Sequence, residues 1–256
     1  MLMAVDVGNT HTVLGLYKGE TLICHWRVRT ELTNTADELA ATIHGLFALK
    51  HIDFNDISRM VLASVVPPIQ SAWRNLAMDL FSFEPLEISS HLDTGLTIKT
   101  DNPAEVGADR IVNAVAAFDK YATPLIIVDF GTAITFDCVS AKGEYLGGII
   151  APGLSISLDA LGQRTAKLPR VDITVTPARA IGTNTIDAIR SGVLFGYGGL
   201  VEELIARITG EMAPAKPKVI ATGGMAALIA PHAPSIEVVE PMLTLEGLRL
   251  LHARNS

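Results

Sequence analysis

The chain has 256 residues, 49% of them hydrophobic, and its 20 basic and 27 acidic side chains give a formal charge of −7. This length fits one or two domains, and the hydrophobic share is ordinary for a globular chain with a complete core. The acidic balance argues against nucleic acid as the main partner. It does not exclude an anionic nucleotide, because local N–H groups and a metal bind such a ligand irrespective of the bulk charge.

Two cysteines, Cys24 and Cys138, stand apart in apolar stretches. Isolated thiols of this kind indicate a reducing compartment rather than a disulfide or a metal cluster. Met1 leads directly into a strand-like run without a signal peptide, and no apolar run approaches the roughly 20 residues that span a bilayer. We therefore expect a soluble, cytoplasmic protein without a membrane partner.

One sequence unit occurs twice in the chain. An apolar run leads into Asp6-Val7-Gly8-Asn9-Thr10, and another leads into Asp129-Phe130-Gly131-Thr132-Ala133. Further apolar residues follow each copy, and then the same turn, Lys18-Gly19-Glu20 and Lys142-Gly143-Glu144. The two aspartates are 123 residues apart and the two turns 124. Strand–loop–strand units at a constant offset predict a duplicated architecture.

The physical chemistry of this unit points to phosphate. Where a strand ends in Asp-x-Gly and turns straight back, successive backbone N–H groups are left unpaired at the tip, and glycine lets an anion approach them. A carboxylate at the strand end can hold a hard cation or a metal-bound water. The alternative is an ordinary tight hairpin, which would suffice for one copy alone. Two copies in matching contexts favour the phosphate site.

Strands and helices alternate along the rest of the first half. A third strand over 21–29 precedes a helix that starts at a capping box formed by Thr35 and Glu38. The other elements expected here are a strand over 59–66, a helix over 69–81, a short strand over 86–88, an irregular stretch over 97–106 and a helix starting near residue 107 or 108. We expect a domain boundary over 118–124.

The second half is rich in glycine. The run 146–153 is expected to be a strand end and a loop, followed by a helix over 155–161. A long helix starts at Gly182-Thr183-Asn184-Thr185, and its inner glycines predict close backbone packing, since each costs about 0.5–1 kcal/mol relative to alanine. Three elements complete the chain: a strand over 218–221 that ends in Thr222-Gly223-Gly224, a helix from Met225, and a last helix capped by the Thr244 hydroxyl.

Strands that alternate with helices twice over predict the α/β class. We divide the chain into two domains, 1–118 and 119–256, each a mixed sheet flanked by helices. The cleft between the domains is the default ligand site.

The stretch Gly107-Ala108-Asp109-Arg110 contains the best candidate for chemistry. Asp109 would lie in the first turn of a helix, where the dipole stabilises a carboxylate, or it could accept the proton of a substrate hydroxyl in a phosphoryl transfer. Arg110 could pair with a substrate carboxylate or with a surface acid. The chain has neither a P-loop nor a Rossmann glycine motif, and of the histidines only His11 is expected near a ligand.

These motifs together resemble a known superfamily. The stretches 6–10, 129–133 and 222–224 resemble the phosphate-1, phosphate-2 and adenosine motifs of the acetate and sugar kinase/Hsp70/actin superfamily. Four further stretches narrow the resemblance to the type III pantothenate kinases: Gly107-Ala108-Asp109-Arg110, Gly148-Ile149-Ile150-Ala151-Pro152-Gly153, Gly182-Thr183-Asn184-Thr185 and Leu243-Thr244-Leu245-Glu246-Gly247-Leu248. The resemblance runs from Met1 to the last helix.

The resemblance implies two duplicated actin/ribonuclease H-like domains and the ATP-dependent phosphorylation of pantothenate at its terminal hydroxyl, the first step of coenzyme A synthesis. Asp109 matches the proton acceptor of the family, and 107–110 match its pantothenate-binding segment. Thr185 matches a threonine that reaches pantothenate, and Thr132 matches a second ATP contact. The loop that holds the ATP phosphates matches Asp6, Val7, Gly8, Asn9, Thr10, His11, Thr12 and Val13.

The resemblance also implies cations and a partner. Asp129 matches the ligand of a monovalent cation, K⁺ or another such as NH₄⁺. Mg²⁺ accompanies ATP, and Asp6 is the side chain expected to orient it. Members of the family are homodimers in which the acceptor site is completed across the interface.

Two positions depart from the family pattern. Thr100 stands where an aromatic residue often lines the pantothenate pocket, and His11 stands where asparagine is frequent. Two other functions stay open at this point: another small-molecule kinase of the superfamily, and a non-catalytic regulator on the same fold. Intact Asp-x-Gly loops together with Asp109 favour catalysis.

Overall fold

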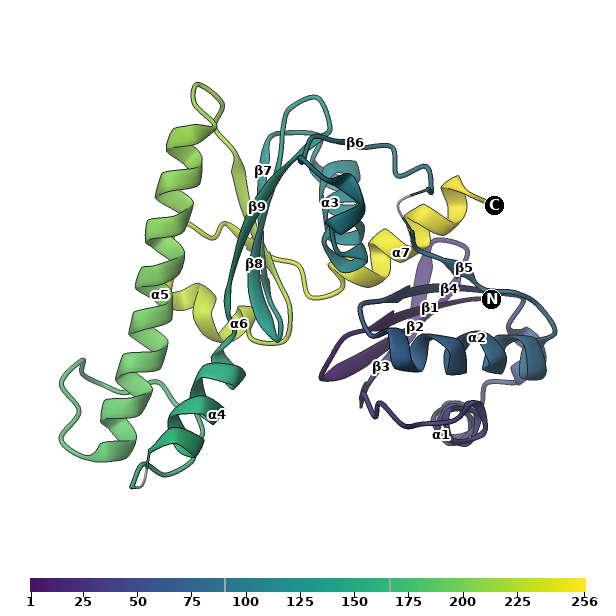
Figure 1. Cartoon of the computed structure of the whole chain (residues 1–256), viewed down its shortest axis with the longest axis horizontal. Helices are drawn as coiled ribbons and strands as arrows, with labels where there is room; N and C mark the ends of the chain where they lie inside the picture. The colour runs from purple at the N-terminus through teal and green to yellow at the C-terminus, as the bar shows by residue number, and fades with distance from the viewer. Residues whose placement is uncertain (90, 166) are drawn as a thin grey trace. The chain divides into compact units, whose positions relative to one another are not determined.

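The computed structural model describes residues 1–89, 91–165 and 167–256 (Figure 1). Its internal contacts divide it into two compact units. The first unit comprises Met1–Leu96, Asp101–Ala116 and Leu243–Ser256, and the second comprises Thr97–Thr100 and Ala117–Met242.

The first unit is built on a five-stranded sheet in the order β3-β2-β1-β4-β5. The first three strands are antiparallel, and β4 and β5 continue the sheet in parallel with β1. The strands are β1 (Leu2–Val7), β2 (His11–Lys18), β3 (Thr21–Arg29), β4 (Arg59–Ser64) and β5 (Leu86–Glu87). The predicted hairpin and third strand are therefore confirmed.

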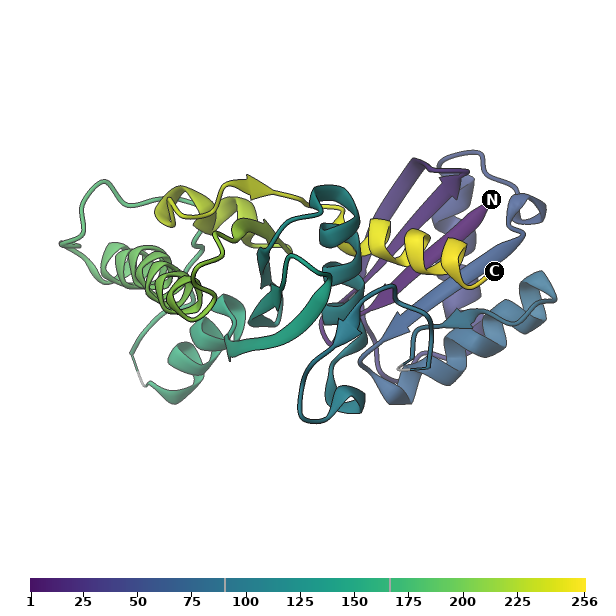
Figure 2. The same ribbon diagram turned by 90° about the horizontal axis from the view of Figure 1, so that it is seen from above.

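Helices cover both faces of this sheet. On one face, α1 (Ala36–Ala48) and α2 (Pro67–Phe81) bury a core with alternate residues of β1, including Val5 and Val7. The predicted capping box starts α1. Gly15 lies on the opposite face, where a Cβ would approach within 2.8 Å of Leu245. That face therefore carries α7 (Leu243–Arg254), which crosses the strands in Figure 2.

Two single turns of 3-10 helix, Phe54–Asp56 and Pro103–Glu105, also belong to the first unit. Helix α3 (Ala108–Tyr121) then runs into the stretch 118–124, where the sequence predicted a domain boundary. Its residues up to Ala116 belong to the first unit, and the following residues belong to the second.

The second unit repeats the first sheet and adds one strand. Its order is β11-β10-β7-β8-β9-β6, with β7-β8-β9 antiparallel and β10 and β11 in parallel with β7. Each repeat has a bulge at the same place, between Leu16 and Tyr17 and between Cys138 and Val139. The strands are β6 (Thr97–Ile98), β7 (Leu125–Phe130), β8 (Ala133–Val139), β9 (Glu144–Pro152), β10 (Lys218–Thr222) and β11 (Val238–Val239). The duplication predicted from the paired motifs is confirmed.

Helix α5 (Thr185–Glu211) packs its buried residues against the core of the second sheet. The expectation that its glycines mark close packing holds at Gly198, where a Cβ would lie 2.4 Å from the carbonyl oxygen of His232. It is wrong at Gly192, Gly196 and Gly199, which have open space in front of them. The other helical segments here are α4 (Leu154–Arg164), α6 (Ala226–Ile229) and the 3-10 turn Ala230–His232.

Several other expectations differ from the structure. The glycine-rich run over 146–153 lies largely in strand β9, because β8 supplies its hydrogen-bond partners. The division by contacts differs from the predicted domains over 1–118 and 119–256, because α7 returns to the first sheet and β6 pairs with β9.

In the described part of the chain, no helix combines the length and apolar character needed to cross a bilayer.

Candidate active site

The first predicted phosphate loop connects β1 to β2 through residues 8–10. Its tip is exposed at Asn9, Thr10 and His11. The N–H of Gly8 donates to the carbonyl oxygen of His11 at 3.1 Å and closes the turn. The expectation of unpaired N–H groups is therefore wrong for Gly8, whose hydrogen bond shapes the loop instead.

The carboxylate of Asp6 lies on a defined face of the first sheet. Side chains alternate along a strand, and Val5 and Val7 both point into the core beneath α1 and α2. Asp6 therefore points to the opposite face, the one on which α7 packs. At the end of β1, this face presents a carboxylate beside the loop.

Thr30 is a buried residue that the motif search missed. Its hydroxyl donates to the carbonyl oxygen of Gly8 at 2.8 Å, and its N–H donates to the carbonyl oxygen of Thr10 at 3.0 Å. The Thr12 hydroxyl, also buried, lies 2.9 Å from that of Thr30. Thr12 therefore faces the interior, so any contact of this residue with a ligand would come from its backbone.

A repeat-based signal could have found Thr30. Thr30 follows the last residue of β3, and Gly153 follows the last residue of β9. These two positions are 123 residues apart, the same offset that separates Asp6 from Asp129. The offset between the aspartates therefore relates Thr30 to Gly153 and would have identified Thr30 as the residue that follows the third strand of the first repeat.

Positive charge surrounds the tip of the first loop. Strand β3 aligns Arg29 with His11 and Arg27 with Val13, so both arginines lie beside the loop and are exposed. Burial and the charges of these two arginines lower the pKa of His11. The imidazole is therefore held neutral more strongly than an ordinary histidine, and the positive field at this end of the strand comes from the arginines.

Asp109 lies in the first turn of α3, where it is half-buried. Its Oδ1 accepts a hydrogen bond from the N–H of Arg110 at 2.9 Å. Burial raises the pKa of the Asp109 carboxyl, and the Arg110 N–H and guanidinium offset this only in part. Gly107 leaves room for the carboxylate, because a Cβ there would lie 2.6 Å from Oδ1. A desolvated carboxylate of raised basicity suits proton transfer.

The C-terminal helix holds the start of α3 on the sheet. Gly247 of α7 lies so close to α3 that a Cβ would meet the carbonyl oxygen of Val112 at 2.1 Å. The Thr244 hydroxyl bonds the side chain of buried Asn113 at 2.7 Å, where the sequence had predicted a helix cap. Since α7 also packs on β1, the helix that carries Asp109 is tied to the face toward which Asp6 points.

The second predicted phosphate loop connects β7 to β8 through Gly131 and Thr132. The Gly131 N–H donates to the carbonyl oxygen of Ala133 at 3.0 Å, so this loop also closes on itself. Gly153 approaches it so closely that a Cβ would lie 2.1 Å from the carbonyl oxygen of Thr132. The end of the glycine-rich run over 146–153 is therefore in contact with the second loop.

Asp129 faces the third glycine motif. Val128 and Phe130 are buried in the core against α5, so Asp129 points to the other face of the second sheet, as Asp6 does in the first. Gly223 has φ of +91° at the end of β10, and a Cβ there would lie 2.4 Å from Asp129 Oδ1. The turn 222–224 and the strand end at Asp129 are therefore packed together.

The two remaining predicted residues lie in the second unit. Thr185 is exposed at the start of α5 and lines a hollow of about 570 Å³ together with Gly182, Thr183 and Asn184. Asn184 caps the helix by accepting from the N–H of Asp187 at 2.9 Å. The Thr100 hydroxyl is buried without a hydrogen-bond partner in the described part of the chain.

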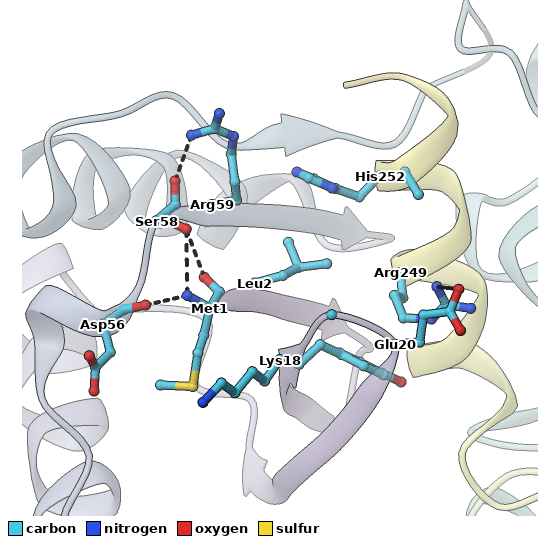
Figure 3. Close-up of a pocket in the computed structure, with 12 residues that line it drawn as sticks. Met1, Leu2, Lys18, Glu20, Asp56, Ser58, Arg59, Arg249 and His252 are labelled. Carbon is cyan, nitrogen blue, oxygen red and sulfur yellow. Dashed lines mark hydrogen bonds and ion pairs between the residues drawn. The ribbon is translucent and has the colours of Figure 1, made fainter.

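The structure thus groups the predicted residues into two sets. The first unit contains the loop over 6–13 and the segment 107–110, and the second contains Asp129, Thr132, Thr100 and Thr185. A cavity of about 680 Å³ at the opposite end of the first sheet, where β1 begins, is lined by Met1, Lys18, Arg59 and His252 (Figure 3). The described residues that line it include none of the predicted ones.

Two repeated mixed sheets, each with an Asp-x-Gly hairpin among its inner strands and helices on its faces, define the α/β fold of the actin-like kinases. Solved structures share this fold. A glucokinase from Streptomyces griseus aligns with 98% of each chain at a TM-score of 0.51 and 13% identity. A Baf family protein from Campylobacter jejuni, named as a transcriptional activator, aligns with 99% of this chain and 98% of its own at 0.61 and 17%. At such identities the likeness concerns the fold alone.

Sequence relatives give the particular family. The family model for type III pantothenate kinase matches residues 2–207. A type III pantothenate kinase from Geobacter sulfurreducens is 52% identical over 255 residues, covering 100% of this chain and 99% of its own. One from Desulforapulum autotrophicum is 53% identical over 252 residues, covering 98% and 96%. The chain belongs to the type III pantothenate kinase family: it phosphorylates pantothenate with ATP in the synthesis of coenzyme A.

Proposed function

We propose that Asp109 is the proton acceptor of this kinase. The observation that supports it most directly is the half-buried carboxylate at the start of α3, whose pKa is raised by burial and whose position is kept open by Gly107. The terminal hydroxyl of pantothenate attacks the γ-phosphorus of ATP, the bond to the β-phosphate oxygen breaks, and Asp109 takes the hydroxyl proton. Phosphoryl transfer needs its nucleophile oriented and its proton received, and a helix start can do both.

The ATP phosphates are assigned to the two hairpin loops. Loop 6–13 and Thr132 supply backbone N–H groups and hydroxyls, and the exposed Arg27 and Arg29 add positive charge near the first loop. Such fixed dipoles stabilise the charge of the transferring group at no cost in reorganisation. Asp6 would hold the Mg²⁺ that accompanies ATP, and this ion would supply positive charge to neutralise the phosphates.

Asp129 is assigned to a monovalent cation, K⁺ or NH₄⁺. Its carboxylate stands at a strand end against the Gly223 turn, where a Cβ would lie 2.4 Å from Asp129 Oδ1. A carboxylate oxygen suits a hard cation, and Asp129 would hold one that supplies positive charge beside the second loop.

Pantothenate is assigned to the segment Gly107-Ala108-Asp109-Arg110 and to Thr185. The Arg110 guanidinium suits the pantothenate carboxylate, and the unpaired Thr100 hydroxyl can donate to the substrate. We also propose a homodimer in the cytoplasm, with the acceptor site completed by the partner subunit. Exposed apolar side chains on β9, α4 and α5 support such an interface: Ile150, Ile156, Leu161, Ile186 and Phe195.

The test measures pantothenate-dependent ADP release with potassium and magnesium present. Asp109→Asn should keep ATP binding and lose turnover by roughly 10²–10⁴-fold, the usual contribution of a general base. Asp119→Asn, a substitution of an exposed acid further along α3, is the matched control and should keep the wild-type rate. Wild-type turnover in Asp109→Asn would refute the assignment of the base.

A further inference from the structure

We propose that Thr30 is a positioning residue for the first phosphate loop, turning its peptide groups so that their N–H bonds face the ATP phosphates. The inference rests on the proposed function, in which the loop over 6–13 binds those phosphates. Thr30 lies outside that loop in the sequence and reaches it by hydrogen bonds to the carbonyl oxygens of Gly8 and Thr10, at 2.8 Å and 3.0 Å.

The geometry of the peptide bond converts these two contacts into an orientation. In a planar trans peptide, the carbonyl oxygen of one residue and the N–H of the next point in opposite directions. Because Gly8 directs its carbonyl oxygen at Thr30, the N–H of Asn9 points away from Thr30. The same reasoning applies to Thr10 and the N–H of His11. Thr30 thereby turns two carbonyl oxygens, which would repel an anion, away from the side on which these N–H groups lie.

The hydroxyl bond belongs to a buried chain of donors. Since the Thr30 hydroxyl donates to the carbonyl oxygen of Gly8, its oxygen is left to accept from the hydroxyl of Thr12, 2.9 Å away. Both side chains are buried, with Thr12 at 2% and Thr30 at 7% exposure, so water does not replace a lost bond easily. Successive hydrogen bonds of this kind reinforce one another in a medium of low dielectric.

The two bonds of Thr30 can be separated by mutation. Thr30→Val keeps the backbone N–H bond to Thr10 and a similar side-chain volume but removes the hydroxyl. The Gly8 peptide then loses its only described hydroxyl donor and becomes free to rotate, which presents a carbonyl oxygen to the phosphates. Thr30→Ser restores the hydroxyl without the methyl group.

The experiment compares the affinities for ATP and pantothenate by calorimetry, together with KM, kcat and thermal unfolding. We expect Thr30→Val to raise the Kd and KM for ATP about tenfold, equivalent to about 1.4 kcal/mol, with the Kd for pantothenate unchanged. Thr30→Ser should return the ATP values to within about twofold of the wild type. Thr42→Val removes another threonine hydroxyl that bonds a carbonyl oxygen, that of Glu38 in α1, and should change neither affinity.

Each outcome distinguishes the inference from its alternatives. A merely structural role would lower the melting temperature and the active fraction while leaving the ATP affinity of the folded protein unchanged, and it would overturn the proposal. So would a Thr30→Ser variant as weak as Thr30→Val. Asp6→Asn serves as the probe of the loop itself. If Asp6→Asn weakens ATP binding and Thr30→Val does not, the positioning by Thr30 is wrong, whereas if neither does, the loop is not the phosphate site.

Discussion

The two proposed phosphate loops of this kinase occupy equivalent places in a repeated architecture, yet they are supported differently. In the first, the residue after the third strand is Thr30, which holds the loop by hydrogen bonds to two carbonyl oxygens. In the second, the equivalent residue is Gly153, whose backbone lies against the loop so closely that a Cβ would be 2.1 Å from an oxygen of Thr132. The first loop accepts a hydrogen bond from the Thr30 hydroxyl, whereas the second loop packs against the backbone of Gly153, which leaves no space for a side chain.

The two halves of a duplicated fold can therefore differ in which substitutions their loops tolerate. A side chain that donates to the loop can be changed in volume so long as its hydroxyl remains. A glycine in van der Waals contact with the loop cannot accept even one carbon without moving the backbone. The proposed catalytic carboxylate, Asp109, lies in the first unit alone, where α7 holds the start of α3 on the first sheet.

Among the tests of this comparison between the loops, the largest effect is expected at Gly153. Gly153→Ala should reduce activity by about 100-fold or more, because displacing a site by about 1 Å can cost that much, and overpacking should cost about 1–3 kcal/mol of stability. The φ of Gly153 is −74°, so space rather than backbone strain is the cause. Steady-state kinetics and thermal unfolding measure both. Gly210→Ala, in a helix position with open space, is the control and should not be destabilised. Wild-type behaviour of Gly153→Ala would remove the contrast between the loops.

The second test compares the cation dependence of Asp6 and Asp129, the aspartates at equivalent positions of the two repeats. Wild-type activity should fall when sodium replaces potassium, and Asp129→Asn should raise the potassium concentration for half-maximal activity at least about tenfold. Asp6→Asn, at the equivalent position of the first repeat, should leave that concentration unchanged and raise the magnesium requirement instead. Potassium titrations of the three proteins provide the measurement. Equal potassium and sodium rates in the wild type would count against a cation at Asp129.

Gly107→Ala tests the support of the base in the first half. A Cβ at this position would lie 2.6 Å from Asp109 Oδ1, so the carboxylate must turn away from its present place. We expect kcat to fall about tenfold while the KM for ATP stays constant, since the displacement affects the acceptor and not the nucleotide loops. Gly45→Ala on α1, where a Cβ meets nothing within 4 Å, is the matched control. An unchanged kcat in Gly107→Ala would show that the carboxylate has room to spare.

The smallest effect concerns stability and pH. Burial raises the pKa of Asp109 in the folded state, so its ionised form opposes folding. The resulting stability is fully present below the unfolded pKa of about 3.9 and is lost as the pH rises through the folded value. Asp109→Asn should therefore melt at a higher temperature than the wild type at pH 7, with the gap closing toward pH 4. A variant that melts lower at pH 7 would contradict the raised pKa.

Much of this molecule could be predicted from local pattern. The two Asp-x-Gly hairpins, the repeat that relates them and the capping box of α1 depend on residues near one another in the sequence, and each is present. The motifs 107–110 and 243–248 carried the resemblance that the family relatives bear out. Periodicity and turn chemistry suffice for such features, because neighbouring residues decide them.

Only the tertiary structure shows which contacts support the loops and which residues allow the helices to pack. Gly247 reads in the sequence as a helix interior glycine, and only the fold shows it making room for the backbone of Val112. Thr30 belongs to no motif, and its hydroxyl reaches the carbonyl oxygen of Gly8 because β3 ends beside the β1–β2 loop. The sequence by itself therefore determined the repeated strands and the class of chemistry. The support of each loop and the return of the last helix to the first sheet depend on contacts between distant residues, which no local pattern specifies.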